Sequence, residues 1–157
     1  MAFDAKEQRR IMGFFATGVT VVTTHSGGVF HGMTANAVTS LSLTPPLVLV
    51  AVDKENQTHA NIREGRCFAV NILNADQEAV SQQFAAPGPK DFSKVAHAIG
   101  STGAPILTDA LGYVDCRLHE ILPGGDHDIF VGEIVEGEAG GGIPLLFYSG
   151  QYRHLAE

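Results

Sequence analysis

The most constraining feature of this sequence is a strand-like run over residues 31–43. It is built from small and hydroxylated residues where a buried strand would normally carry bulky ones. A Pro-Pro pair follows at positions 45 and 46, where we expect the sheet to break, and then an apolar run over residues 47–52 that is typical of a central strand. Small side chains let a flat ligand lie close to the main chain, and hydroxyl and amide groups can bond its polar rim. An ordinary strand that lies under a helix explains the same residues.

Composition and charge place the chain among globular proteins. Of its 157 residues, 45% are hydrophobic and 17% are charged, which is enough for one domain with a buried core, residues 1–157. The formal net charge is −7, and no basic cluster stands out beyond Arg9-Arg10, so we expect no nucleic-acid partner. No apolar run approaches the roughly 20 residues that span a bilayer, and the N-terminus lacks the apolar core of a signal peptide. We therefore expect a cytoplasmic protein without a membrane segment.

The cysteines and histidines point to neither disulfide nor metal chemistry. Cys67 and Cys116 lie far apart in apolar strand-like runs, and no C-x-x-C pair exists, so we expect two buried free thiols. The histidines form no H-x-x-x-H or H-x-H pair, and we expect no metal site.

The order of elements predicts a mainly β fold with short helices. Eighteen glycines without a period indicate many turns. We expect helices over residues 5–16, ended by Gly18, over 59–64, capped by Thr58, and from residue 76 onward. We expect strands over 19–24, 29–43, 47–52, 67–73, 114–119, 127–136 and 145–148, a glycine turn at 27–28, and a loose segment over 86–110 with a helical turn near 92–97. Hairpins without regular helical crossovers indicate an antiparallel barrel, closed or nearly closed.

Two common nucleotide-binding signatures, G-x-x-x-x-G-K-[ST] and G-x-G-x-x-G, are missing, so a P-loop or Rossmann site has no support. Residues 53–61 offer another way to hold a phosphate. A helix that starts at Thr58 would present free N–H groups and the positive end of its dipole. Lys54 and the Thr58 hydroxyl could add to this site. A solvent loop with an ordinary N-cap explains the same residues.

His127 follows a Gly-Gly turn at the start of a predicted strand, where its side chain could face the mouth of a pocket. Hydride transfer from a nicotinamide needs close stacking of two rings rather than strong acid–base catalysis. His127 could position such a ring or bond its amide, although a single histidine is more often structural. No G-x-S-x-G elbow surrounds Ser40 or Ser42, so hydrolysis is a poor interpretation.

Several segments, taken in order along the chain, resemble the flavin reductase family. They are residues 12–24, 32–37, 40–42, 46–50, 68–73, 125–134 and 144–152. The resemblance covers nearly the whole chain and is to members such as the phenol and 4-hydroxyphenylacetate hydroxylase reductases. It implies an antiparallel split β-barrel of the FMN-binding type, with FMN or FAD as the flavin and NADH or NADPH as the hydride donor. It also implies a homodimer that supplies reduced flavin to a separate flavin-dependent oxygenase component.

The resemblance implies site residues by position. The flavin would be lined by Thr34, Ala35, Asn36, Ala37, Ser40 and Leu41, with Phe84 and Ala85 on its outer side. Its ribityl phosphate would be flanked by Ala51, Val52, Asp53 and Lys54, together with Thr58 and Asn61. The nicotinamide would meet His127 as the catalytic residue, with Tyr152 nearby. The loop over residues 86–105 is a candidate lid.

Two other functions remain open at this point. A non-catalytic flavin-binding protein on the same barrel would hold flavin without an open nicotinamide slot, and His127 and Tyr152 would be idle in it. An oxidase of the pyridoxamine-phosphate type needs cations for its substrate phosphate, and few lie near the expected pocket. The sequence does not decide between FMN and FAD, because the resemblance covers users of both. It does not decide between NADH and NADPH, because the basic residue that would bind a 2′-phosphate cannot be placed.

Overall fold

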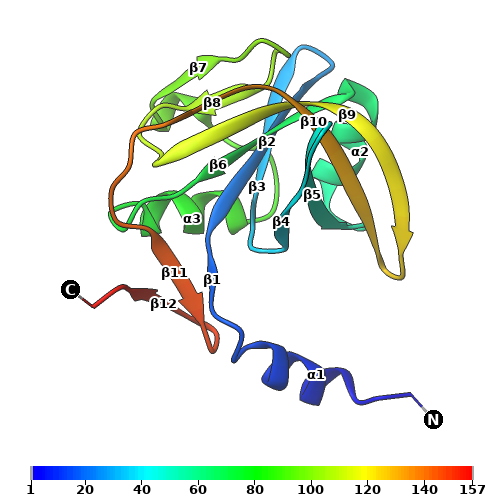
Figure 1. Ribbon diagram of the computed structural model, residues 1–157, viewed down its shortest axis with the longest axis vertical. Coiled ribbons are helices and arrows are strands. Elements are labelled where there is room, and N and C mark those ends of the chain that lie inside the picture. The colour runs from blue at the N-terminus through cyan, green and yellow to red at the C-terminus, as the bar shows by residue number, and fades with distance from the viewer. Residues whose placement is uncertain (1, 157) are drawn as a thin grey trace.

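A seven-stranded antiparallel sheet organises the molecule in the computed structural model, which describes residues 2–156 (Figure 1). Its strand order is β3-β2-β6-β9-β10-β5-β4. The strands are β2 (Thr20–Ser26), β3 (Val29–Ala35), β4 (Val38–Leu43), β5 (Pro46–Asp53), β6 (Cys67–Ile72), β9 (Gly112–Gly124) and β10 (His127–Ala139). A smaller sheet joins β1 (Thr17–Gly18), β11 (Leu145–Tyr148) and β12 (Gln151–His154). The mainly β fold with short helices is therefore confirmed.

The small-residue run is two strands rather than one, which corrects the expected strand over residues 29–43. β3 and β4 form the opposite edges of the sheet, and the chain passes from one edge to the other through Asn36 and Ala37. The sheet must therefore curl, and side chains from both margins, such as Met33 and Val50, share one core. β3 and β4 form no ladder with each other among the described residues. The barrel is open at this seam, as a split barrel requires.

The β4–β5 hairpin differs from expectation at its turn and on one face. The Pro-Pro pair does not break the sheet, because Pro46 begins β5 and lies opposite Leu43 after a cis Thr44–Pro45 bond. β5 has ladder partners on both sides, β4 and β10, as a central strand should. However, only one of its faces is fully buried, through Val48, Val50 and Val52.

The helices lie outside the sheet. α1 (Ala5–Met12) ends at Gly13, not at Gly18, because residues 17 and 18 pair with β11 as β1. No α1 residue is buried, and the helix projects from the body of the molecule (Figure 1). α2 (Gln57–Gly65) is capped by Asn56, whose side chain accepts a hydrogen bond from the main chain of Thr58, so the expected Thr58 cap is wrong. α3 (Glu78–Ala85) begins two residues later than expected and buries Phe84 in the core.

The segment over residues 86–110 is more ordered than expected. It holds a 3-10 turn, η1 (Phe92–Lys94), and a hairpin of β7 (His97–Ile99) and β8 (Pro105–Leu107). The hairpin turn is anchored by the fully buried carboxylate of Asp115, which accepts hydrogen bonds from the Thr102 main chain at 3.0 Å and the Thr102 hydroxyl at 2.6 Å. Cys67 and Cys116 are buried free thiols, as predicted.

Candidate functional site

A cavity of about 1000 Å³ lies between β3, the start of α2, α3 and the loop that follows α3. Its lining on the sheet side comprises Val19, Val29, Phe30, His31, Gly32, Met33, Thr34, Ala35 and Asn36. Its lining elsewhere comprises Glu55, Asn56, Gln57, Thr58, Asn61, Ser81, Phe84, Ala85, Ala86, Pro87, Gly88, Pro89, Lys90, Phe147 and Tyr152. The cavity is large enough for an organic cofactor of the size that such clefts usually hold.

The β3 wall offers main-chain groups to a ligand. The Gly27-Gly28 turn, with φ of +58° and +76°, makes Ser26 and Val29 the closing pair of the β2–β3 hairpin. Antiparallel pairing then points the N–H and C=O groups of alternate β3 residues, Gly32 and Thr34 among them, away from β2. Since β3 is an edge strand, these groups have no strand partner. The wall is suited to the polar rim of a flat ring.

Gly32 brings this wall close to α3. A Cβ atom at position 32 would lie 2.9 Å from two ring carbons of Phe84 and 3.3 Å from the Val22 carbonyl oxygen. Phe84 is fully buried, so its ring has little room to move away. The absence of a side chain at Gly32 therefore sets the spacing between β3 and α3.

Hydrogen bonds join the cavity walls. The Thr34 hydroxyl donates to the carbonyl oxygen of Ser81 at 2.5 Å, and the Ser81 and Tyr152 hydroxyls are 2.7 Å apart. These contacts connect β3, α3 and β12. Because the Thr34 hydroxyl already donates to Ser81, this residue can offer a ligand its main-chain groups and the accepting side of the hydroxyl oxygen.

The start of α2 forms a second wall of the cavity. Asn61 is only 6% exposed, and its Nδ2 atom has no hydrogen-bond partner among the described residues. Its Oδ1 atom accepts from Gln57 Nε2 at 3.5 Å. An unpaired buried amide is costly, and a phosphate oxygen would satisfy it. The positive dipole end of the helix acts in the same sense, although the Thr58 N–H is already bonded to the Asn56 cap.

A histidine–carboxylate pair fixes α2 against the sheet. His59 Nε2 lies 2.7 Å from Asp128 Oδ2 on β10, and the His59 ring meets the Phe130 ring edge-to-face at 5.0 Å. The hydrogen bond from His59 holds the pKa of Asp128 below its usual value, with a smaller contribution from the charge of Lys54. The pair therefore orients the helix whose first turn lines the cavity.

The structure brings eight of the expected site residues together. Thr34, Ala35, Asn36, Thr58, Asn61, Phe84, Ala85 and Tyr152 all line the cavity. The other eight, Ala37, Ser40, Leu41, Ala51, Val52, Asp53, Lys54 and His127, do not line it. The Ala37 carbonyl accepts from the Ala51 main chain at 3.0 Å, Val52 is buried in the core, and Ser40 and Leu41 are exposed on the opposite edge strand.

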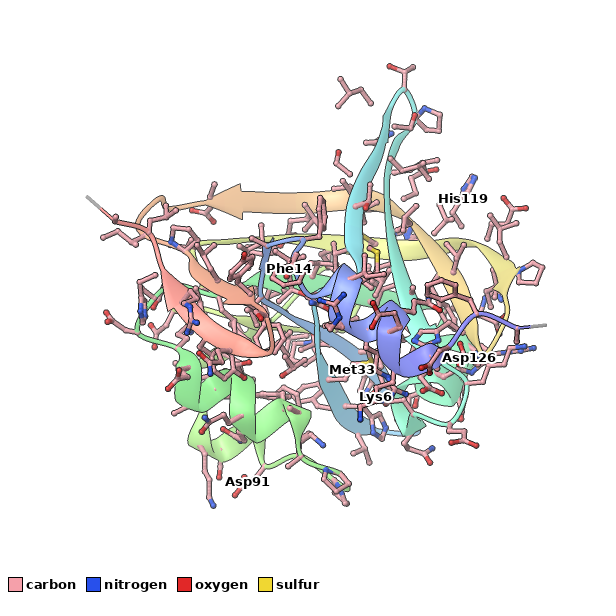
Figure 2. The ribbon with its side chains drawn as sticks, turned by 90° about the horizontal axis from the view of Figure 1, so that it is seen from below. Lys6, Phe14, Met33, Asp91, His119 and Asp126 are labelled. Carbon is pink, nitrogen blue, oxygen red and sulfur yellow. The ribbon has the colours of Figure 1, made fainter. Side chains whose placement is uncertain are left out.

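His127 lies beside the cavity wall rather than in it. It is paired with Asp53 in the β10–β5 ladder. Asp53 precedes Asn56 by three residues in the chain, and Asn56 lines the cavity. Its Nδ1 atom is 2.7 Å from Asp126 Oδ1, and its side chain is 40% exposed. That hydrogen bond, together with the charge of His127, holds the pKa of Asp126 below its usual value. Figure 2 shows Asp126 at the outer side of the molecule.

Sequence reasoning found part of the lining only as a segment. Glu55, Asn56 and Gln57 lie within the predicted phosphate segment over residues 53–61 but were not singled out, and they line the cavity around the start of α2. Residues 86–90 belong to it because the loop after α3 returns past β3. The sequence marked this loop by its Pro87-Gly88-Pro89 composition, but not its place. No group of three or more metal-ligating side chains, and no helix able to cross a membrane, occurs within residues 2–156.

Comparison with known proteins identifies the chain. The family described as flavin reductase like domain matches residues 12–156, and the chain belongs to this family. It is 47% identical over 152 residues, 97% of its own length and 82% of the relative's, to the reductase component of a 4-nitrophenol 4-monooxygenase/4-nitrocatechol 2-monooxygenase of Rhodococcus opacus.

Solved structures agree with this assignment. The flavin reductase component of a bacterial two-component tryptophan halogenase superposes with a TM-score of 0.92 at 41% identity, over 98% of this chain and 99% of that one. The NADH:FAD oxidoreductase of Streptomyces globisporus, in complex with NAD and FAD fragments, superposes with a TM-score of 0.92 at 38% identity, over 99% of this chain and 97% of that one. The resemblance of the sequence to flavin reductases and the split-barrel fold class are confirmed.

Proposed function

We propose that this protein is an NADH-dependent flavin reductase that reduces FMN or FAD and supplies the reduced flavin to a partner monooxygenase. The observation that carries the proposal is the cavity itself, lined by the edge strand β3 and by α2, whose buried Asn61 amide has no partner within residues 2–156. A flat ring with a polar rim and a phosphate tail satisfies both walls. The similar reductase component from Rhodococcus opacus and the NADH:FAD oxidoreductase from Streptomyces globisporus support the same function.

The chain contributes binding and orientation. Main-chain groups of Gly32 and Thr34 hold the rim of the ring, and the Phe84 side chain closes its outer side. The first turn of α2, with Asn61, holds the phosphate. A bound flavin supplies the atom that accepts hydride, so the protein needs to align two rings rather than provide a strong acid or base.

His127 and Tyr152 are the residues we assign to the nicotinamide. Tyr152 lines the cavity and is held by Ser81, so its ring is fixed. His127 pairs with Asp53, shortly before the start of α2, and its hydrogen bond with Asp126 orients the imidazole. The two residues come from separate elements, β12 and the start of β10, and we assign both to the nicotinamide because the resemblance to flavin reductases implies these positions.

The charge of the lining favours NADH as the donor. Lys90 is the only lysine or arginine among the described residues that line the cavity, and Glu55 adds a negative charge. A 2′-phosphate needs a basic residue of its own.

The proposal extends to assembly and location. Ile11, Met12, Phe14 and Phe15 are all exposed apolar side chains around the projecting α1, and a second copy of the chain would cover them in a homodimer. Two unpaired thiols suit a reducing, cytoplasmic compartment. Residues 1–157 act as one reductase domain, supported by a sheet that combines strands from both halves of the chain.

Anaerobic bleaching of the flavin tests the proposal. The purified protein is mixed with FMN or FAD and then with NADH or NADPH, and loss of the visible absorbance of oxidised flavin is followed. Catalytic bleaching, faster with NADH, is expected. Tight flavin binding without bleaching by either nucleotide would instead establish a flavin carrier, and absence of flavin binding would remove the proposed function altogether.

A further inference from the structure

Ser81 is a fully buried hydroxyl residue in the middle of α3. It shares the buried face of this helix with Phe84, and both residues line the cavity. Serine is a poorer helix former than alanine, and a buried hydroxyl is costly without a hydrogen-bond partner. Helix formation and packing alone would therefore favour alanine at position 81, so the contacts of the hydroxyl explain the serine.

The Ser81 hydroxyl bonds a tyrosine on another element. Its partner is the hydroxyl of Tyr152 on β12, at 2.7 Å. The half-buried Tyr152 ring also meets the Phe147 ring edge-to-face at 5.4 Å, from the paired position on β11. The tyrosine ring is therefore held at two points, by Phe147 beside it and by Ser81 at its hydroxyl end.

The main chain of Ser81 contacts the opposite wall. Its carbonyl oxygen accepts a hydrogen bond from the Thr34 hydroxyl at 2.5 Å, and Thr34 belongs to β3. One helix residue thus bonds the β3 wall through its carbonyl and β12 through its side chain. Ser81 thereby sets the position of the Tyr152 ring relative to the strand that lines the cavity.

β12 is otherwise loosely attached. It lies at the outer edge of the small sheet and pairs only with β11 among the described strands (Figure 1). Within residues 2–156, one other side-chain hydrogen bond joins it to the rest of the molecule, from His154 Nε2 to the Ala75 carbonyl at 3.2 Å. His154 lies two residues after Tyr152, on the same face of the strand, but does not line the cavity. The two contacts therefore form a natural pair for comparison.

We propose that Ser81 is a positioning residue for hydride transfer, because its hydroxyl fixes the Tyr152 ring and thereby aligns the nicotinamide with the flavin. This inference rests on the proposed function, and in particular on the assignment of Tyr152 to the nicotinamide. Hydride transfer depends steeply on the alignment of the two rings. A Tyr152 ring without its anchor thus lowers the rate of reduction and leaves the flavin site in place.

Tyrosine NMR of the protein without nucleotides tests the contact itself. The chain has three tyrosines, Tyr113, Tyr148 and Tyr152, so ring-labelled protein gives few signals, and Tyr152→Phe assigns the one of interest. In Ser81→Ala the Tyr152 signal should shift, because the ring has lost its hydroxyl partner, whereas the other two signals should stay. A Tyr152 signal that does not change would overturn the proposal.

FMN binding and anaerobic reduction test the consequence. For Ser81→Ala we expect the rate of FMN reduction at saturating NADH to fall about fivefold, the effect of one neutral hydrogen bond. The dissociation constant of FMN and the melting temperature should not change, because alanine favours the helix and the Thr34 bond to the main chain remains. A purely structural serine would instead lower the melting temperature or the FMN affinity together with the rate.

A double variant and a matched control complete the test. Ser81→Ala combined with Tyr152→Phe should reduce FMN no more slowly than Tyr152→Phe alone, because both changes remove the same hydrogen bond. Additive losses would show that Ser81 acts apart from Tyr152, and an equal loss in His154→Ala would show that loosening of β12 is sufficient; either result overturns the proposal. If wild type does not reduce FMN with NADH, the proposed function fails first and this inference fails with it, while the NMR signals still report the contact.

Discussion

Two histidine–carboxylate pairs stand next to each other at the start of β10, and they differ mainly in burial. His59 and Asp128 are 2.7 Å apart, with side chains 11% and 13% exposed. His127 and Asp126 are also 2.7 Å apart, but their side chains are 40% and 91% exposed. Strand alternation produces the contrast, because adjacent residues of β10 point to opposite faces. One pair packs under α2, and the other faces solvent beside the cavity.

The difference in burial gives the two pairs different tasks. An ion pair away from water is stronger, and removing one partner leaves the other unsatisfied. An exposed pair contributes little to stability but keeps its imidazole oriented. We therefore expect the His59–Asp128 pair to control folding and the position of α2, and the His127–Asp126 pair to control the nicotinamide step.

His59→Ala should have the largest effect. The variant removes the partner of Asp128 and the edge-to-face contact with Phe130, and the lost ring contact alone should lower the free energy of unfolding by about 1 kcal/mol. FMN affinity should fall too, because the first turn of α2 lines the cavity. Urea unfolding and FMN titration measure both, with His127→Ala as the matched control. Equal loss of stability in the two variants would contradict the assigned tasks.

Asp128→Asn should change the pH dependence of stability. The pKa of Asp128 is lower in the folded protein than in the unfolded chain, because of its hydrogen bond from His59. The ionised carboxylate thus stabilises the fold above the unfolded-state pKa of about 3.9, and this contribution is lost as pH falls through the folded-state pKa.

Urea unfolding at a series of pH values measures the effect of Asp128→Asn. The variant should be less stable than wild type at neutral pH, and the gap should narrow in acid. A gap that stays constant with pH would show that the carboxylate does not act through its charge.

The sequence predicted the sheet strands better than their arrangement. The alternation in β9, the glycine turn of the β2–β3 hairpin and the apolar face of β5 are local features, and local patterns find them. The division of residues 29–43 between opposite edges is not local. The side chains of Asn36 and Ala37 do not indicate this division, because the division depends on how far the whole sheet curls.

The site was predicted where it depends on one element and missed where it depends on several. Thr34, Ala35 and Asn36 share one strand, and they line the cavity together. The sequence indicated Lys54 as the cation of the site, whereas the packing of α3 and its loop puts Lys90 in the cavity lining. The buried partner of Asp128 was also missed, because His59 is 69 residues away in the chain.

His127→Ala should separate catalysis from binding. Because the side chain lies beside the cavity and not in its lining, flavin affinity should remain near that of wild type. Reduction of bound flavin by NADH should slow about tenfold, the effect of one lost hydrogen bond to the nicotinamide. Anaerobic stopped-flow absorbance gives the rate, and fluorescence titration gives the affinity. Equal losses in both would remove the proposed nicotinamide role.

Replacing Ala35 with leucine provides the converse of that experiment. Ala35 lies on β3 at the cavity, and its side chain packs in the core, so a large side chain there should overpack and displace the β3 wall and block flavin binding. A Leu43→Ala variant, at an exposed position on the β4–β5 turn, serves as the control. Retained flavin affinity in Ala35→Leu would show that the ring binds elsewhere.

Asp126→Asn should have the smallest effect. Its hydrogen bond from His127 lowers the pKa of the Asp126 carboxyl, so the side chain is ionised at neutral pH and can orient the imidazole. Because Asp126 is so exposed, solvent screens the pair and the asparagine variant should unfold at the wild-type urea concentration. Reduction by NADH should slow, but by less than in His127→Ala, since an asparagine oxygen can still accept from the ring. A double variant that slows no further than His127→Ala alone would show that Asp126 acts only through that histidine, whereas additive losses would mean that the carboxylate contacts the nucleotide itself.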